Sequence, residues 1–228
     1  MTIFRFALMR SMRKRLTLIS LCAVPFAMVL FPPVWVSENG FGFSFYGLVI
    51  LYAAFLLVRS IMTDRINKIT VRIFAAPVTN FQYLFQNLLG FLLLLSIQIV
   101  AVLSLGAVLY GWEAAAVCKL MLGYILFAMS SIAFSLAWNS LFRSKEMSDG
   151  VFSVIISLMA LLGGVFIPVS ILPGILQKIG MLFPTYWLSS ALLSVRYGYK
   201  GQGFWLAAVM LLLFTVIFLL FGSKRRLE

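Results

Sequence analysis

The sequence predicts an all-α integral membrane protein with six transmembrane helices, an N-terminal amphipathic interface helix and a re-entrant helical hairpin between spans five and six. Two observations predict this class. Hydrophobic residues make up 63% of the chain and charged residues only 11%, which leaves little sequence for a soluble domain. Apolar runs also recur that reach the ~20 residues a helix needs to cross a bilayer. Residues 1–228 are therefore expected to form a single transmembrane domain.

The expected spans are 16–36, 42–62, 81–110, 114–141, 150–172 and 203–221. The arm before them, residues 1–15, alternates apolar and basic positions at spacings that give a helix one apolar and one cationic side. Such a helix lies flat in the headgroup region. Spans one and two, residues 16–62, are joined by a short turn, and Pro25 should kink the first of them.

The link between spans two and three, residues 63–80, leaves two readings open. Ile66, Ile69 and Ile73 fall at helical spacing with basic residues on the other side, which favours a short amphipathic helix parallel to the membrane. The alternative is a solvated loop that carries charges for topology. Pro77 should end any helix here, after which Thr79 or Asn80 can cap span three.

Spans three and four, residues 81–141, contain polar residues in apolar surroundings. Span three would be roughly 45 Å long at 1.5 Å per residue, so it must tilt, bend or begin below the membrane. A buried polar group needs a partner, so the first interpretation of Gln98 in span three is that it takes part in contacts between helices. Span four has a face of small residues, which lets another helix approach closely and is interpreted first in the same way. Contact with a transported molecule is the sharper alternative. The candidate residues for such a path are Gln98, Ser131, Ser135 and Asn139.

The stretch from 163 to 196 combines strong apolarity with repeated helix breakers. Backbone at membrane depth must have its polar groups satisfied, so residues 173–196 are expected to form two short helices that dip into the outer leaflet and return. The alternative is a kinked extension of span five followed by an interfacial helix. The residues that would fix the breaks are Gly164, Pro168, Pro173 and Pro184, with Tyr186 in the interface.

Basic residues divide unequally between the two faces and predict that both termini lie in the cytoplasm. One face would hold Arg5, Arg10, Arg13, Lys14, Arg15, Arg65, Lys68, Arg72, Arg143, Lys145, Lys224, Arg225 and Arg226, and the other only Lys178, Arg196 and Lys200. The net charge of +12 is thus explained by topology and anionic lipid, and no nucleic-acid partner is expected.

Several chemistries are not expected from this chain. It has no G-x-x-x-x-G-K-[ST] phosphate loop, no histidine, and six acidic residues that all fall in links, turns or the tail. Neither a metal site, a catalytic triad nor an ion-coupling carboxylate at mid-membrane is indicated. Cys22 and Cys118 lie within spans and indicate no disulfide framework. The chain is not expected to be an enzyme, and energy for any transport should come from another chain.

The sequence resembles the membrane subunits of type-2 ATP-binding-cassette exporters, the ABC-2 permeases. The link reads Arg65…Lys68-Ile69-Thr70…Ile73…Pro77-Val78-Thr79…Tyr83, where Ile69 replaces the family's glycine and Asp64 is the candidate for its acidic position. The more specific match is Gly164-Val165-Phe166-Ile167-Pro168…Leu172-Pro173…Pro184-Thr185-Tyr186.

The resemblance covers essentially the whole chain and implies roles for both motifs. The link would be a helix that couples to cytoplasmic ABC ATPase subunits, which would bind the ATP and Mg; this chain would need no cofactor. The coupling residues would be Asp64, Arg65, Lys68, Ile69, Arg72, Phe74 and Pro77. The hairpin of Gly164, Pro168, Pro173, Pro184 and Tyr186 would form an outer gate with a second permease copy or a homologous permease.

Two functions from different classes stay open at this point. The first is a dimeric exporter permease in the plasma membrane, with a bacterial inner membrane favoured, for an amphipathic or hydrophobic cargo such as a drug, antibiotic, peptide or lipid-linked molecule. The second is a non-transporting membrane scaffold or a subunit of an immunity or sensory complex. An ion-coupled carrier is a distant third, because intramembrane charges and an evident internal repeat are both missing.

Overall fold

The computed structural model describes residues 2–13, 15–35, 41–67, 69, 78–142, 144–196 and 202–224. These residues form helices and connecting turns, with no strand among them, which confirms the all-α class. The elements are α1 (Thr2–Arg13), α2 (Arg15–Val29), α3 (Pro32–Trp35), α4 (Phe41–Ile66), α6 (Asn80–Tyr110), α7 (Ala114–Leu141), α8 (Lys145–Leu162), the 3₁₀ turn η1 (Val169–Ile171), α9 (Gly174–Gly180), α10 (Pro184–Arg196) and α11 (Gln202–Lys224).

Four helices are long and apolar enough to cross a membrane: α4, α6, α7 and residues 203–224 of α11. They correspond to expected spans two, three, four and six. Expected span one is instead divided between α2, which has 15 residues, and the four-residue α3. Expected span five becomes α8, which has 18 residues, carries charged residues in its first turns and ends at Leu162 rather than at residue 172.

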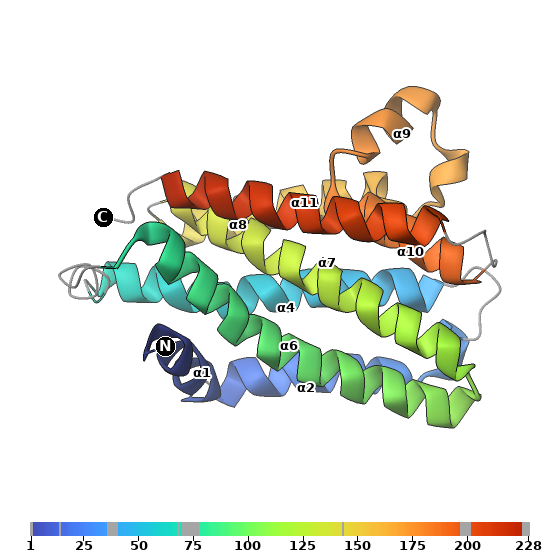
Figure 1. The fold of residues 1–228 in the computed structure, drawn as a ribbon, viewed down its shortest axis with the longest axis horizontal. Helices are drawn as coiled ribbons and strands as arrows, with labels where there is room; N and C mark the ends of the chain where they lie inside the picture. The colour runs from blue at the N-terminus through green and yellow to red at the C-terminus, as the bar shows by residue number, and fades with distance from the viewer. Residues whose placement is uncertain are drawn as a thin grey trace.

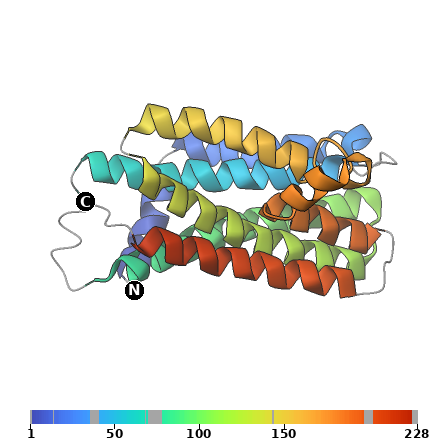
Figure 2. The same ribbon diagram turned by 90° about the horizontal axis from the view of Figure 1, so that it is seen from above.

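The long helices run along the long axis of an elongated bundle, with α2 and α8 alongside them (Figures 1 and 2). α1 crosses this bundle near one end, and the C-terminal end of α11 lies at the same end. We call this the termini end and the opposite one the far end. α9 stands away from the bundle toward the far end (Figure 1).

Local sequence signals explain where α6 and α8 begin and end. The Thr79 hydroxyl accepts a hydrogen bond from the Gln82 backbone N–H, and the Gln82 side chain accepts one from the Thr79 N–H. This capping box confirms Thr79 as the cap of α6. At its other end Gly111 adopts a left-handed φ of 65°, which a glycine tolerates at a helix C-terminus. Ser144 caps α8 through the Met147 N–H.

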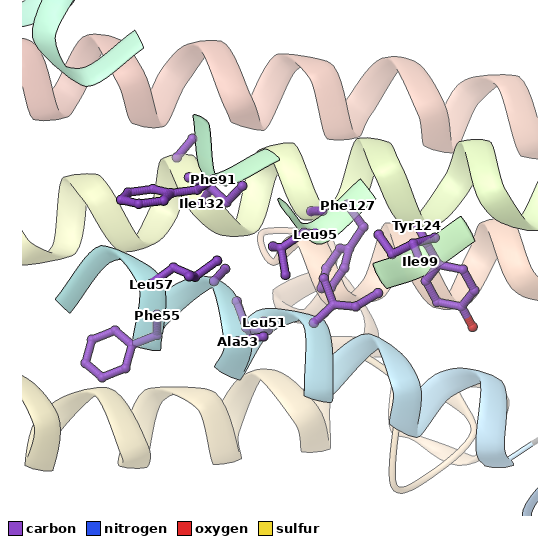
Figure 3. Packing of buried hydrophobic residues seen from close by; sticks show 14 of the residues in the cluster. Leu51, Ala53, Phe55, Leu57, Phe91, Leu95, Ile99, Tyr124, Phe127 and Ile132 are labelled. Carbon is purple, nitrogen blue, oxygen red and sulfur yellow. The ribbon is translucent and has the colours of Figure 1, made fainter. Parts of the chain in front are cut away.

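The core lies between α4, α6 and α7, whose apolar side chains meet along most of the bundle (Figure 3). Residues such as Leu51, Phe91 and Phe127 have no exposed surface. α7 is central, since it packs against α4, α6, α10 and α11. A buried side chain of this size contributes about 1.5–3 kcal/mol relative to its exposed state in water. Within a membrane, packing is the larger part of that gain.

The far end of the bundle is closed by an aromatic cluster. Trp35 lies 5.0 Å from Phe43, 6.0 Å from Tyr46 and 5.5 Å from Trp112, measured between ring centroids. The Trp35 indole N–H donates to the Met28 carbonyl at 2.8 Å, and the Tyr124 hydroxyl donates to the Phe43 carbonyl at 2.7 Å. Aromatic pairs at these distances add stability beyond their buried area. They fill this end of the bundle with side chains.

Candidate functional site

The last turns of α4 are the point where other helices are tied together at the termini end. Asp64 forms an ion pair with Arg10 of α1, and both side chains are largely buried. Arg10 also donates to the Asn87 side-chain oxygen of α6 at 3.1 Å and lies over the Phe91 ring, 5.8 Å from its centroid. α1 is therefore held to α4 and α6 through one arginine.

Two further arginines connect α4 to α7 and α8. Arg65 donates to the Asn139 carbonyl at 2.9 Å and to the Phe142 carbonyl at 3.5 Å. These carbonyls belong to the C-terminal end of α7, where unpaired acceptors and the helix dipole favour a cation. One turn or more earlier in α4, Arg59 forms an ion pair with Asp149 in the first turns of α8.

The first turn of α8 carries a second carboxylate, Glu146. Its own backbone N–H and the Ser144 hydroxyl, at 3.2 Å, donate to this carboxylate and lower its pKa. The group is fully exposed. It is therefore a charged surface residue of the termini end rather than part of the ion pairs.

The structure places the residues expected to couple to an ATPase in two different ways. Asp64 and Arg65 contact other helices of this chain, as described above. Ile69 is helical and 42% exposed, close to Ile66, which is 58% exposed. Lys68, Arg72, Phe74 and Pro77 lie outside the described residues.

The four polar residues considered for a translocation path are enclosed by side chains. Gln98 is 4% exposed, Ser131 and Ser135 have no exposed surface, and Asn139 is 3% exposed. The Ser135 hydroxyl donates to the Ser131 carbonyl at 2.8 Å, and the Asn139 side-chain oxygen accepts from Ser148 at 3.4 Å. Within the part of the chain that the structure describes, neither polar atom of Gln98 has a hydrogen-bond partner. All four occupy the interior of the helix packing.

The segment after α8 turns sharply and is held by two hydroxyl groups of α10. Gly164 has a φ of 82°, a conformation that L side chains rarely adopt. Thr185 donates to the Met159 carbonyl at 2.8 Å, and Ser189 donates to the Gly163 carbonyl at 2.6 Å. The Gly163 carbonyl, just beyond α8, thereby gains a hydrogen-bond donor. The Met159 carbonyl accepts from Thr185 in addition to the Gly163 backbone N–H, which is 2.9 Å away.

The expected breaks of this segment fall at element boundaries. Pro168 precedes η1, Pro173 precedes α9, and Pro184 is the first residue of α10. Pro168 and Pro173 are exposed, Pro184 is buried, and the Tyr186 ring lies 5.4 Å from that of Trp187. Several apolar residues of α9 and its flanks are strongly exposed, including Ile171 at 71%, Ile175 at 75% and Leu182 at 69%, whereas Leu176 and Phe183 are half-buried.

Sequence reasoning missed the contacts made by Arg10, Arg59, Asp149, Thr185 and Ser189. Arg59 and Asp149 did carry a signal, since each is a charge inside or beside an apolar run. Thr185 and Ser189 carried none, because a hydroxyl in a helix usually bonds its own backbone. Among the described residues, no group of three His, Cys, Asp or Glu side chains could hold a metal ion.

Comparison with known proteins identifies the family to which this architecture corresponds. A family model described as ABC-2 family transporter protein matches residues 36–224. The match begins before α4, includes the link to α6 and continues through α11. No curated protein matches the sequence closely enough to be compared with it.

Proposed function

Because the chain belongs to the ABC-2 transporter family, we propose that it is the permease subunit of an ATP-driven exporter that works as a dimer. The family match over residues 36–224 is the observation that carries this proposal, and the four apolar helices agree with it. ABC-2 permeases are membrane components of ABC transporters and act with ABC ATPase subunits. ATP and Mg would bind to that partner, since this sequence lacks a phosphate loop.

The proposed topology has six spans, with α2 and α8 as spans one and five. The termini end is cytoplasmic in this proposal, because the basic residues gather there. α1 then lies in the cytoplasmic interface. Its buried face includes Ala7 and Ser11, while Phe6 and Met12 are 70% and 62% exposed and would contact lipid.

The proposed path for cargo runs between two permease copies rather than through one. The interior of the protomer favours this arrangement, since Gln98 and Ser131 are enclosed and the aromatic cluster fills the far end. The segment from Gly164 to Tyr186 would form the outer gate with its copy on the partner. With 15% aromatic and only 11% charged residues, the chain favours an amphipathic or hydrophobic cargo.

The test is ATP-dependent movement of cargo by the reconstituted complex. The chain would be purified with the ATPase subunit that accompanies it, placed in proteoliposomes and given a lipophilic fluorescent drug or a labelled amphipathic peptide. Movement that requires Mg-ATP supports the proposal. Stable assembly with an ATPase but no movement of any such compound would favour a scaffold or an immunity or sensory subunit instead.

A further inference from the structure

Helix α8 buries one face along its length, at Ser148, Phe152, Ile156 and Met159, and leaves the opposite face uncovered. Its outward side chains, including Val151, Val154 and Leu158, are 39–60% exposed. Its packing partners are α4 and α7 near the termini end, and α9 and α10 toward the far end. α8 therefore connects two regions that are otherwise far apart along the bundle (Figure 2).

The attachment at the termini end is both ionic and aromatic. Arg59 and Asp149 form an ion pair, and beside it the Phe55 and Phe152 rings stack with centroids 3.6 Å apart and planes 13° from parallel. Phe55 is 4% exposed and Phe152 is fully buried. In Figure 3 the Phe55 side chain extends from α4 toward the neighbouring helix. The two contacts lie at positions i and i+4 on α4 and at i and i+3 on α8, so one face of each helix makes both.

The attachment at the far end leaves little freedom for rearrangement. Thr185 and Ser189 of α10 donate to the carbonyls of Met159, in α8, and of Gly163, which follows α8 directly. A Cβ added to Gly163 would lie 2.1 Å from the Thr185 hydroxyl oxygen, and one added to Gly180 would lie 2.6 Å from the Leu162 carbonyl oxygen. The ends of α8, α9 and α10 are thus packed closely together, and close packing of this kind transmits displacement from one element to the next.

We infer that α8 carries movement of the termini end of α4 to the α9–α10 segment, with Arg59 and Asp149 as the positioning residues at its near end. This rests on the proposed function, since the movement would begin where α4 continues into the ATPase-coupling link. At the far end, the hydrogen bonds of the Thr185 and Ser189 hydroxyls connect the end of α8 to α10, so that a displacement of α8 also displaces α10. Arg59 and Asp149, which contact neither cargo nor ATPase in this proposal, would then determine how strongly the two ends of the permease are coupled.

The experiment measures whether nucleotide changes the accessibility of the far-end segment. The complex with its ATPase is reconstituted after Cys22→Ala and Cys118→Ala, and Leu182→Cys supplies a reporter at an exposed position. A membrane-impermeant maleimide is applied with Mg-ATP and without nucleotide. In this parent, Mg-ATP is expected to change the labelling rate. Asp149→Arg or Arg59→Glu should reduce that change about tenfold, the effect of ~1.4 kcal/mol of coupling between neighbouring residues.

Reversing the charges of both Arg59 and Asp149 shows whether a single variant loses its response because the ion pair is broken or because the protein is generally destabilised. The double variant Arg59→Glu with Asp149→Arg should restore the response, and Asp149→Asn serves where the reversed variant does not assemble. Glu146→Gln is the matched control, because it removes a fully exposed carboxylate near Arg59 while the Arg59–Asp149 ion pair stays in place. Single variants that respond like the parent, or a double variant that fails to restore the response, overturn the inference while the permease proposal stands. A parent with no nucleotide response overturns both.

Discussion

Replacing Asp64 by Asn is expected to loosen α1 from the bundle. The substitution keeps the shape of the side chain but removes the charge that pairs with Arg10. The Arg10 and Asp64 side chains are only 21% and 15% exposed, so solvent screens the pair incompletely. A hydrogen bond to a charged group contributes about 1.5–3 kcal/mol, and the lower end applies to a pair with some exposure. Arg10 keeps its contacts with Asn87 and Phe91, which limits the loss.

A loss of ~1.4 kcal/mol corresponds to a tenfold change in an equilibrium constant. The fraction of time that α1 spends detached should therefore rise about tenfold, and amide hydrogen exchange measures such local opening directly. In the purified protein, exchange of the α1 amides should accelerate about tenfold in the Asp64→Asn variant, while exchange in α11 stays unchanged.

Two comparisons make this prediction specific to the pair. Arg5→Met is the control, because it removes an exposed cation from the same helix. Arg10→Met combined with Asp64→Asn should cost less than the sum of the two single changes, since each already breaks the pair. Unchanged exchange in α1 after Asp64→Asn, or costs that simply add, would refute the argument that this ion pair holds α1.

Three other predictions test the link, the cap and the outer segment. Ile69→Asp should abolish co-purification of the ATPase but leave membrane insertion intact, because burying one apolar side chain at the interface contributes about 1.5–3 kcal/mol. If the variant assembles and transports normally, the link is only a loop whose charges set the topology. Thr79→Ala should cost about 1 kcal/mol and accelerate amide exchange several-fold in the first turn of α6 only, so an unchanged rate there would contradict the capping box. Cysteines at Leu176 and Phe183 should be shielded at rest and change labelling during ATP turnover, whereas free labelling independent of nucleotide would leave only an interfacial anchor.

Composition and local signals were enough to predict the long helices. The expected span 114–141 has the same bounds as α7, and 81–110 differs from α6 by one residue. Thr79 sets the start of α6 and Gly111 sets its end, and both signals act over a few residues. α8 departs from expectation because Gly163 and Gly164 end it, although the apolar composition continues.

The contacts at the candidate site could not be predicted in the same way. Arg59 and Asp149 are 90 residues apart, and Arg10 and Asp64 are 54 apart. Which charge meets which depends on how the helices are arranged around α7, and helical periodicity contains no such information. Arg65 is an example. Its position in the link led to the prediction that it contacts an ATPase, whereas in the structure its side chain donates to the Asn139 carbonyl at the end of α7.

The excess length of α6 can be explained from the position of α1. α6 has 31 residues, and α1 crosses it at Gly90, where an added Cβ would lie 3.1 Å from that of Ala7. From Gly90 to Tyr110 the helix rises about 30 Å, which matches the ~30 Å hydrocarbon core of a bilayer. With α1 in the interface, as proposed, the residues before Gly90 extend about 15 Å farther, beyond the membrane core. Of the three possibilities open from sequence, the arrangement thus favours a helix that begins below the membrane. The first turn of α6 lies at the same end of the bundle as α1 (Figure 1), and it follows directly in sequence on the link on which an ATPase would act.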